Sequence, residues 1–197
     1  MNVPALKAAL DHAGHRLSPT ASDDALLTDR PANTIAAAVL VPIVLRAEPT
    51  ILLTERTRHL SSHAGQVSFP GGRIEPTDQG PLHAALRETH EEIGLEPGLV
   101  DVVGHLPEHL TGTGYHITPI VGVVAPGFTL RPDPNEVAAV FELKLSVLLD
   151  PQGTRRERRE FKGRMREYWV VEHPTQFIWG ATAAILVNFG RLLRGGV

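Results

Sequence analysis

Apolar positions along the chain predict several strands with helices between them. The continuous apolar run TIAAAVLVPIVL at Thr34–Leu45 has the length of a buried strand. Across a short turn, TILLTER at Thr50–Arg56 predicts its hairpin partner. QVSFPGG predicts a strand that ends at the Pro-Gly-Gly break. The remaining predicted strands are Leu99–His105, His116–Val124, Val137–Leu143 and Glu167–Glu172.

Three segments predict helices. One helix is expected to begin at Pro81 and to end at Gly94, because proline is tolerated in a first turn and glycine is favoured just after a last one. A second is predicted over Gln176–Leu193, and a short one at residues 3–14 before a polar arm. Strands and helices mix without a regular βα repeat, so an α+β fold is expected. We expect an N-terminal helix and arm at residues 1–33 and one domain at residues 34–194.

Composition limits the classes of protein to consider. Of 197 residues, 42% are hydrophobic and 21% charged, which suits a folded domain with a sizeable core. The absence of cysteine excludes disulfides and thiolate chemistry. A formal net charge of −3 argues against a generally basic nucleic-acid-binding protein. The N-terminus lacks a secretory signal pattern and no stretch reaches 18 apolar residues, so a cytoplasmic protein without a membrane or nucleic-acid partner is expected.

The predicted helix before Gly94 carries an unusual group of acidic residues. In RETHEEIGL, Glu88, Glu91 and Glu92 fall on one helical face. Glu88 and Glu92 form a like-charge i,i+4 pair, which costs about 0.2–0.5 kcal/mol. An exposed acidic face is one interpretation. A divalent cation site is the other, since magnesium needs only one or two carboxylates beside substrate phosphates. The predicted apolar stripe of this helix is Leu82, Ala85, Leu86, Thr89 and Ile93.

The residues before the helix complete a known pattern. FPGGRIEPTDQGPLHAALRETHEEIGL (Phe69–Leu95) resembles the Nudix box, G-x5-E-x7-R-E-U-x-E-E-x-G-U, where U is aliphatic. The second half matches at Arg87, Glu88, Glu91, Glu92, Gly94 and Leu95, with Thr89 in an aliphatic position. The first half departs from the pattern. Counted from Gly72, Asp78 stands at the glutamate position, one residue further from Arg87 than the pattern has it, so its pairing with Arg87 is open.

The segment upstream of the box narrows the resemblance. LLTERTRHLSSHAGQVSFPGG (Leu52–Gly72) is similar to LLTxRSxxLRxHxGxVxFPGG, the motif of the coenzyme A (CoA) pyrophosphatase branch of the Nudix family. Thr57 replaces its serine, and Ser61 stands where an arginine is common. Two later segments, LTGTGYHITPIVGVV and QFIWGATAAIL, are also similar to this branch.

The resemblance implies a fold, a reaction and a set of site residues. The fold is a mixed β-sheet sandwiched between α-helices, with the box as a loop–helix–loop. The implied reaction is hydrolysis of the CoA diphosphate to 3′,5′-ADP and 4′-phosphopantetheine, with Mg²⁺ or Mn²⁺ held by Glu88, Glu91 and Glu92. Glu91 or Glu136 would accept the proton of water, and Arg87 would orient the glutamates. The implied substrate contacts are Arg56, His63, Phe69, Gly71, Gly72 and Tyr115.

Other interpretations stay open at this point. The substrate could be another nucleoside diphosphate derivative such as NADH or ADP-ribose, or the domain could be a non-catalytic nucleotide-binding module. The basic segment Arg155–Arg166 has seven Lys and Arg residues in twelve positions. It predicts a solvated hairpin or loop, or alternatively a clamp for the 3′-phosphate of CoA.

Overall fold

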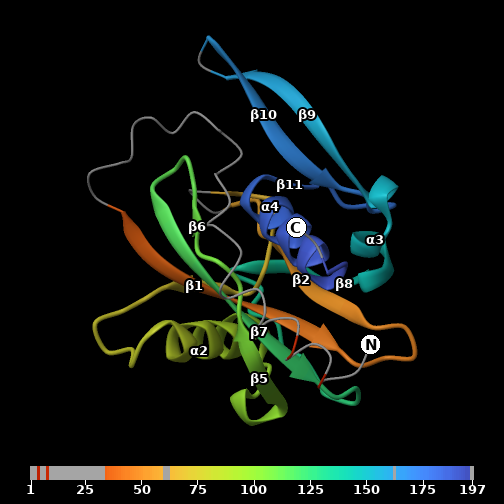
Figure 1. Cartoon of the computed structure of the whole chain (residues 1–197). Coiled ribbons are helices and arrows are strands. Elements are labelled where there is room, and N and C mark those ends of the chain that lie inside the picture. The colour runs from red at the N-terminus through yellow and green to blue at the C-terminus, as the bar shows by residue number, and fades with distance from the viewer. Residues whose placement is uncertain (1–3, 5–7, 9–33, 60–62, 162, 196–197) are drawn as a thin grey trace.

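The computed structural model of the chain describes residues 4, 8, 34–59, 63–161 and 163–195 (Figure 1). The predicted helix at residues 3–14 and the polar arm therefore lie almost wholly outside the described residues. None of the helices in the described ranges is long and apolar enough to cross a membrane.

A mixed eight-stranded sheet forms the centre of the molecule. Its long middle strand β1 runs parallel to β7 through ten paired residues and antiparallel to β2 and β4. β5 and β6 pair with β7, while β3 and β8 pair with β2. The strands are β1 Ile35–Val44, β2 Thr50–Arg56, β3 Val67–Ser68, β4 Gly71–Arg73, β5 Val100–His105, β6 His109–Leu110, β7 Tyr115–Val124 and β8 Val137–Lys144.

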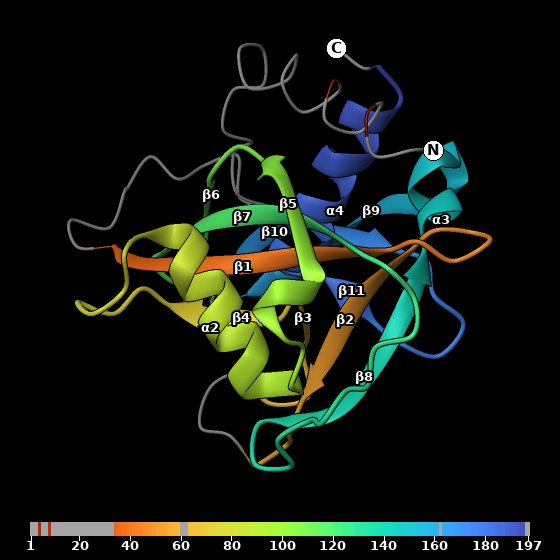
Figure 2. The ribbon, with the colours of Figure 1, turned by 90° about the horizontal axis from the view of Figure 1, so that it is seen from below.

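Helices cover both faces of this sheet (Figure 2). The helix α2 (Pro81–Ile93) packs on Leu40 and Ile120, and α4 (Gly180–Leu193) packs on Val41 and Val121 of the opposite face. Residues of alternating parity on β1 and β7 thus enter different cores, as the two-residue period of a strand requires. The prediction of an α+β fold with a sheet between helices is confirmed.

A second sheet stands beside α4 and projects from the body (Figure 1). It consists of β9 (Thr154–Phe161), β10 (Arg164–Val171) and the short β11 (Ile178–Trp179), in the order β11-β10-β9. The helix α3 (Leu145–Leu149) and two 3₁₀ turns, η1 (Pro97–Leu99) and η2 (Pro151–Gly153), complete the chain.

Three predicted elements differ from the structure, one of them the strand predicted at Glu167–Glu172, which begins at Arg164 as β10. The Pro-Gly-Gly break does not end the pairing, because Gly71 begins β4 beside β1 with φ 146°. A Cβ at Gly71 would lie 2.4 Å from the Ala38 carbonyl oxygen, so only glycine lets the two backbones approach this closely. The C-terminal helix begins at Gly180 and not at Gln176, because Ile178 is buried as part of a strand paired with β10.

One buried histidine makes the stability of the fold depend on pH. His109 of β6 is 1% exposed, and its Nδ1 atom has no hydrogen-bond partner in the described part of the chain. Burial disfavours the charged ring and lowers the pKa of His109 to about 4. Between pH 6.5 and 4 the unfolded chain therefore binds a proton that the folded chain does not, and the free energy of unfolding falls as the pH falls.

We expect this residue to cost the protein about 3 kcal/mol of stability between pH 7 and pH 4. Urea unfolding of wild type and His109→Leu at several pH values measures it, since the variant lacks the titrating group. As the pH falls from 7 to 4, the free energy of unfolding of wild type should fall by about 3 kcal/mol more than that of His109→Leu. A difference that is constant over this range would contradict the prediction.

Candidate active site

The helix α2 carries the acidic residues with the predicted limits but with a rotated buried face. It begins at Pro81 and ends where Gly94, with φ 68°, donates its N–H to the His90 carbonyl. Leu82, predicted to be buried, is 43% exposed. The buried residues are Ala84, Ala85, Thr89, Glu92 and Ile93. Compared with the predicted orientation, the helix is rotated about its axis so that one of the three glutamates, Glu92, is buried.

Glu92 is that buried carboxylate, with a side chain that is 3% exposed. One of its oxygens, Oε2, accepts the backbone N–H of Gly71 at 3.1 Å, and Oε1 lies 3.4 Å from Nη1 of Arg56. Loss of hydration outweighs both contacts and raises the pKa of Glu92 to about 7. The site therefore holds a carboxylate whose negative charge is poorly compensated by its neighbours.

Two further carboxylates add negative charge near Glu92. Burial raises the pKa of Glu88, and repulsion from Glu136 raises the pKa of both Glu88 and Glu92. The loop that carries Glu136 is fixed beside α2, because Asp133 donates its N–H to the Glu92 carbonyl and Thr57 donates its N–H to the Glu136 carbonyl. The structure thus brings Glu136 from a distant part of the sequence close to the glutamates of the box.

Glu91 is the most exposed of the three box glutamates. Its side chain is 57% exposed, and Oε2 accepts a hydrogen bond from Nη1 of Arg87 at 2.9 Å. The same Arg87 nitrogen donates to Oε1 of Glu88 at 3.0 Å. Arg87 therefore contacts two of the three glutamates, and its role in orienting them stays a prediction.

Asp78 anchors Arg87 from the loop before the helix. Nε and Nη2 of Arg87 donate to the two Asp78 oxygens at 3.0 and 2.9 Å, a bidentate pair. Nδ1 of His83 lies 2.8 Å from Oδ1, and the Glu75 N–H donates to Oδ2. These contacts hold the pKa of Asp78 well below its usual range, with the Arg87 hydrogen bond as the largest cause. Asp78 has a shorter side chain than the glutamate of the box pattern and lies one residue further from Arg87 in the sequence. It nevertheless forms the pair with Arg87 that the sequence left open.

The chemistry of these side chains suits a hard divalent cation. Carboxylate oxygens are what Mg²⁺ and Mn²⁺ prefer. Burial first, and repulsion between the glutamates second, raise the pKa values of Glu88 and Glu92, and a bound cation would oppose both effects. Within the described ranges, no three His, Cys, Asp or Glu side chains are grouped closely enough to hold a metal by themselves. Magnesium commonly takes one or two carboxylates and completes its shell with water and substrate phosphates. Glu88 and Glu92 can supply these two carboxylates.

The predicted substrate contacts lie in three different places in the structure. Arg56, Gly71 and Gly72 surround Glu92 and Glu88, since a Cβ on Gly72 would lie 2.5 Å from the Glu88 carboxylate. Phe69, however, is 3% exposed and belongs to the core beneath α4, so its side chain packs inside the fold and does not face a ligand.

His63 and Tyr115 form an edge-on ring contact with centroids 6.4 Å apart. The guanidinium of Arg73 joins them, 5.9 Å from the Tyr115 ring centroid. Sequence reasoning did not select Arg73. Its position directly after the glycine pair was the available signal.

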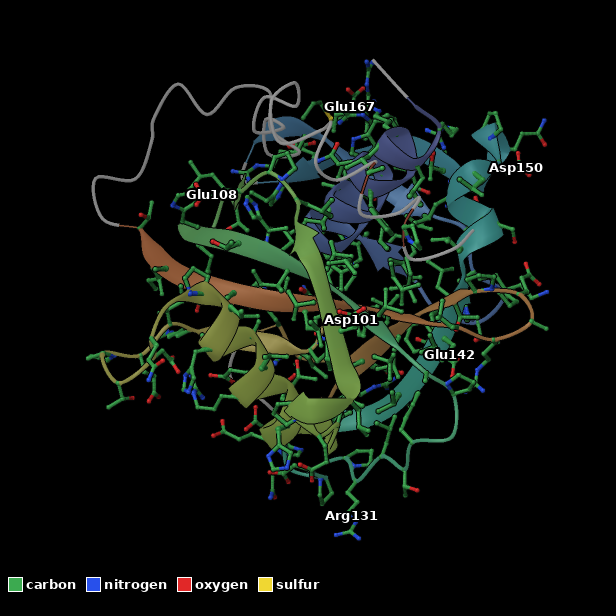
Figure 3. All side chains as sticks on the ribbon, turned by 60° about the horizontal axis from the view of Figure 1, so that its bottom comes forward. Asp101, Glu108, Arg131, Glu142, Asp150 and Glu167 are labelled. Atoms are coloured by element: carbon green, nitrogen blue, oxygen red, sulfur yellow. The ribbon has the colours of Figure 1, made fainter. Side chains whose placement is uncertain are left out.

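The basic segment forms the β9–β10 hairpin, as the solvated interpretation predicted. Arg155 bonds Glu157 and Glu172, and Arg158 pairs with Glu167 at 2.8 Å. Arg156 covers the Trp169 ring at 4.2 Å. Figure 3 labels Glu167 on the side of the molecule away from α2. Several of these cations are thus occupied by neighbours within the hairpin.

Comparisons with known proteins agree with this geometry. A family model described as "NUDIX domain" matches residues 34–173. "Uncharacterized Nudix hydrolase NudL" of Escherichia coli (strain K12) is 43% identical over 150 residues, which cover 76% of this chain and 78% of that protein. Its counterpart in Shigella flexneri is 42% identical over 156 residues, covering 79% and 81%.

A solved structure shares the fold. The MutT/nudix family protein from Enterococcus faecalis superposes with a TM-score of 0.52 at 14% identity, covering 82% of this chain and 63% of that chain. At this identity the match concerns the fold alone.

Proposed function

Because the chain belongs to the Nudix hydrolase family, we propose that it hydrolyses the diphosphate bond of CoA or a CoA derivative. The products are 3′,5′-ADP and 4′-phosphopantetheine, or its acylated form. The curated relatives support a Nudix hydrolase of nucleoside diphosphate derivatives, and the choice of CoA rests on the upstream motif.

The observation that carries the proposal is the contact between two separate motifs. Arg56 comes from the segment similar to the CoA pyrophosphatase branch, and Glu92 comes from the box helix, yet their side chains lie 3.4 Å apart. A guanidinium presents a planar fork of donors that matches phosphate oxygens. The upstream motif, which suggests the substrate, and the box helix, which suggests the reaction, are thus in contact.

Each side chain has a role in this scheme. Glu88 and Glu92 would hold Mg²⁺ or Mn²⁺, and Glu91 would join them if its side chain released Arg87. The bound cation would neutralise the diphosphate and lower the pKa of an attacking water. Arg56 binds a phosphate oxygen and leaves Glu92 free to turn to the metal.

The base that accepts the proton of water is Glu136 or Glu91. Electrostatic coupling to Glu92 favours Glu136, while Glu91 is coupled to Glu88 and has a side chain that is 57% exposed. We include α4 in the catalytic domain at residues 34–194, because Leu186 and Phe189 are fully buried in the core of the sheet.

Product analysis tests the proposal. Purified protein is incubated with CoA, ADP-ribose or NADH in the presence of Mg²⁺ or Mn²⁺, and products are separated by chromatography. We expect equal amounts of 3′,5′-ADP and 4′-phosphopantetheine from CoA, with a higher kcat/KM than for the other two, and no turnover after chelation. A higher kcat/KM for ADP-ribose or NADH would overturn the choice of CoA. A lack of turnover with all three, without Mn²⁺ binding in calorimetry, would favour the non-catalytic module.

A further inference from the structure

Three residues from separate segments meet at the end of β4. Arg73 ends β4, Tyr115 begins β7, and His63 lies in the loop after β2. Nη2 of Arg73 donates to the Tyr115 hydroxyl at 3.3 Å, and the His63 ring meets the Tyr115 ring edge-on at an interplanar angle of 75°. We refer to these three residues as the Arg73 cluster.

The register of the sheet places Arg73 directly after Gly72, the residue whose Cβ direction leads to the glutamates. Arg73 follows Gly72 directly, and its carbonyl accepts Nη2 of Arg87 at 3.3 Å. Successive strand residues point to opposite faces. Since the Cβ direction of Gly72 leads to Glu88, the Arg73 side chain extends to the other face of the sheet, away from α2. A ligand that contacts both groups must therefore pass over the end of β4.

The electrostatics of the cluster suit an anion. No carboxylate is within ion-pair distance of Arg73 in the described part of the chain, and its contacts there are with Tyr115. The hairpin cations Arg155 and Arg158 differ in this respect, because each is paired with glutamate. Arg73 thus offers a guanidinium fork whose charge is not balanced by a neighbouring side chain.

His63 is held in an unusual backbone conformation. Its φ of 56° makes it the one non-glycine residue with positive φ among the described residues. Such conformations are strained and concentrate at ligand sites. Its Nδ1 donates to Oε1 of Gln66 at 2.9 Å, so Nε2 is an acceptor in the neutral ring and a donor toward an anion in the protonated ring.

We propose that Arg73, Tyr115 and His63 form a second anion subsite, which binds a phosphate monoester of the substrate apart from the diphosphate that is cleaved. This inference rests on the proposed function, in which that group is the 3′-phosphate of a CoA-class nucleotide. A fork of guanidinium donors, a phenol hydroxyl and the Nε2–H of a protonated imidazole together match the oxygens of a phosphate monoester.

Paired ligands that differ by one phosphate test the subsite. Arg73→Gln is compared with wild type for binding of 3′,5′-ADP and AMP by calorimetry, and for KM with CoA and dephospho-CoA. We expect the Kd of 3′,5′-ADP and the KM of CoA to rise roughly 10- to 100-fold, the loss typical of one hydrogen-bonded charge. The values for AMP and dephospho-CoA should change less than about twofold, because those ligands lack the phosphate that the subsite binds. Tyr115→Phe should act in the same direction with a smaller effect.

Arg158→Gln is the matched control, because it removes the same charge from a residue already paired with Glu167. It should leave all four values near wild type. An equal effect of Arg73→Gln on both members of each pair, or no effect on either, would overturn the subsite. Failure of wild type to cleave CoA would refute the proposed function separately, since the binding comparison of 3′,5′-ADP with AMP requires no turnover.

Discussion

Replacing Glu92 with glutamine is expected to lower kcat by roughly 10²–10⁴ while the protein stays folded. The change preserves the shape of a side chain that lies 3.1 Å from the Gly71 N–H, but it removes the charge that a divalent cation requires. Steady-state kinetics with CoA and Mg²⁺ measures the loss, and Mn²⁺ titration by calorimetry should show weakened binding. Glu96→Gln is the control, since that side chain is 68% exposed beyond the end of α2.

The same substitution has a predictable effect on stability. The pKa of Glu92 is raised to about 7, above its ordinary value of 4.5. In the metal-free protein the folded chain therefore retains a proton between these values that the unfolded chain releases, and stability falls as the pH rises through this window. Glu92→Gln lacks that penalty, so without metal it should melt no lower than wild type at pH 8. Turnover within about threefold of wild type would contradict the proposed role, because a lost catalytic carboxylate costs far more.

Most of the helices and strands can be predicted from the local pattern of hydrophobic residues. β1, β2 and α2 lie within one residue of their predicted limits, because each has a clear apolar run or a proline and glycine at its ends. Periodicity does not record how neighbouring backbones pair. β4 and β11 are strands of three and two residues whose existence depends on the partners β1 and β10, so their sequences carry little signal.

The candidate site divides along similar lines. The box identifies Glu88, Glu91 and Glu92, but their different exposures depend on how α2 rotates against the sheet. Leu82 on the predicted stripe is exposed, while Glu92 is buried. A helix orientation chosen only to bury the most hydrophobic side chains would do the opposite. A buried carboxylate is costly to fold, and such an exception to patterning is where a functional site is expected.

Long-range contacts were the least predictable part. Glu136 was an even choice between a turn residue and a site residue in the sequence, and only the docking of its loop on Thr57 and α2 brings it near Glu92. Arg73 and Tyr115 are separated by forty-two positions and meet because β4 and β7 both pair with β1.

Gly72→Ala is expected to lower kcat by about 10²-fold or more with little loss of stability, a displacement of about 1 Å being enough for such an effect. The added Cβ would lie 2.5 Å from the Glu88 carboxylate, which is closer than atoms can approach. The obstacle is the far end of a flexible side chain and not the backbone, so Glu88 can turn aside and β4 can remain paired with β1. The carboxylate would then leave the position from which it holds the cation.

The Gly72→Ala experiment has a matched control elsewhere in the same chain. Gly98 has open space around its Cβ position and no positive φ, so Gly98→Ala should change neither kcat nor the melting temperature. Circular dichroism melting and CoA kinetics are compared for the two variants and wild type.

If Gly72→Ala unfolds, the steric conflict reaches the backbone and the Glu88 side chain does not move aside. If it folds and turns over at the wild-type rate, the position of Glu88 does not control catalysis, and the pairing of Glu88 with Glu92 as metal ligands is wrong. An intact fold with lost turnover means that the glycine is required because the carboxylate, and not the strand, needs the space.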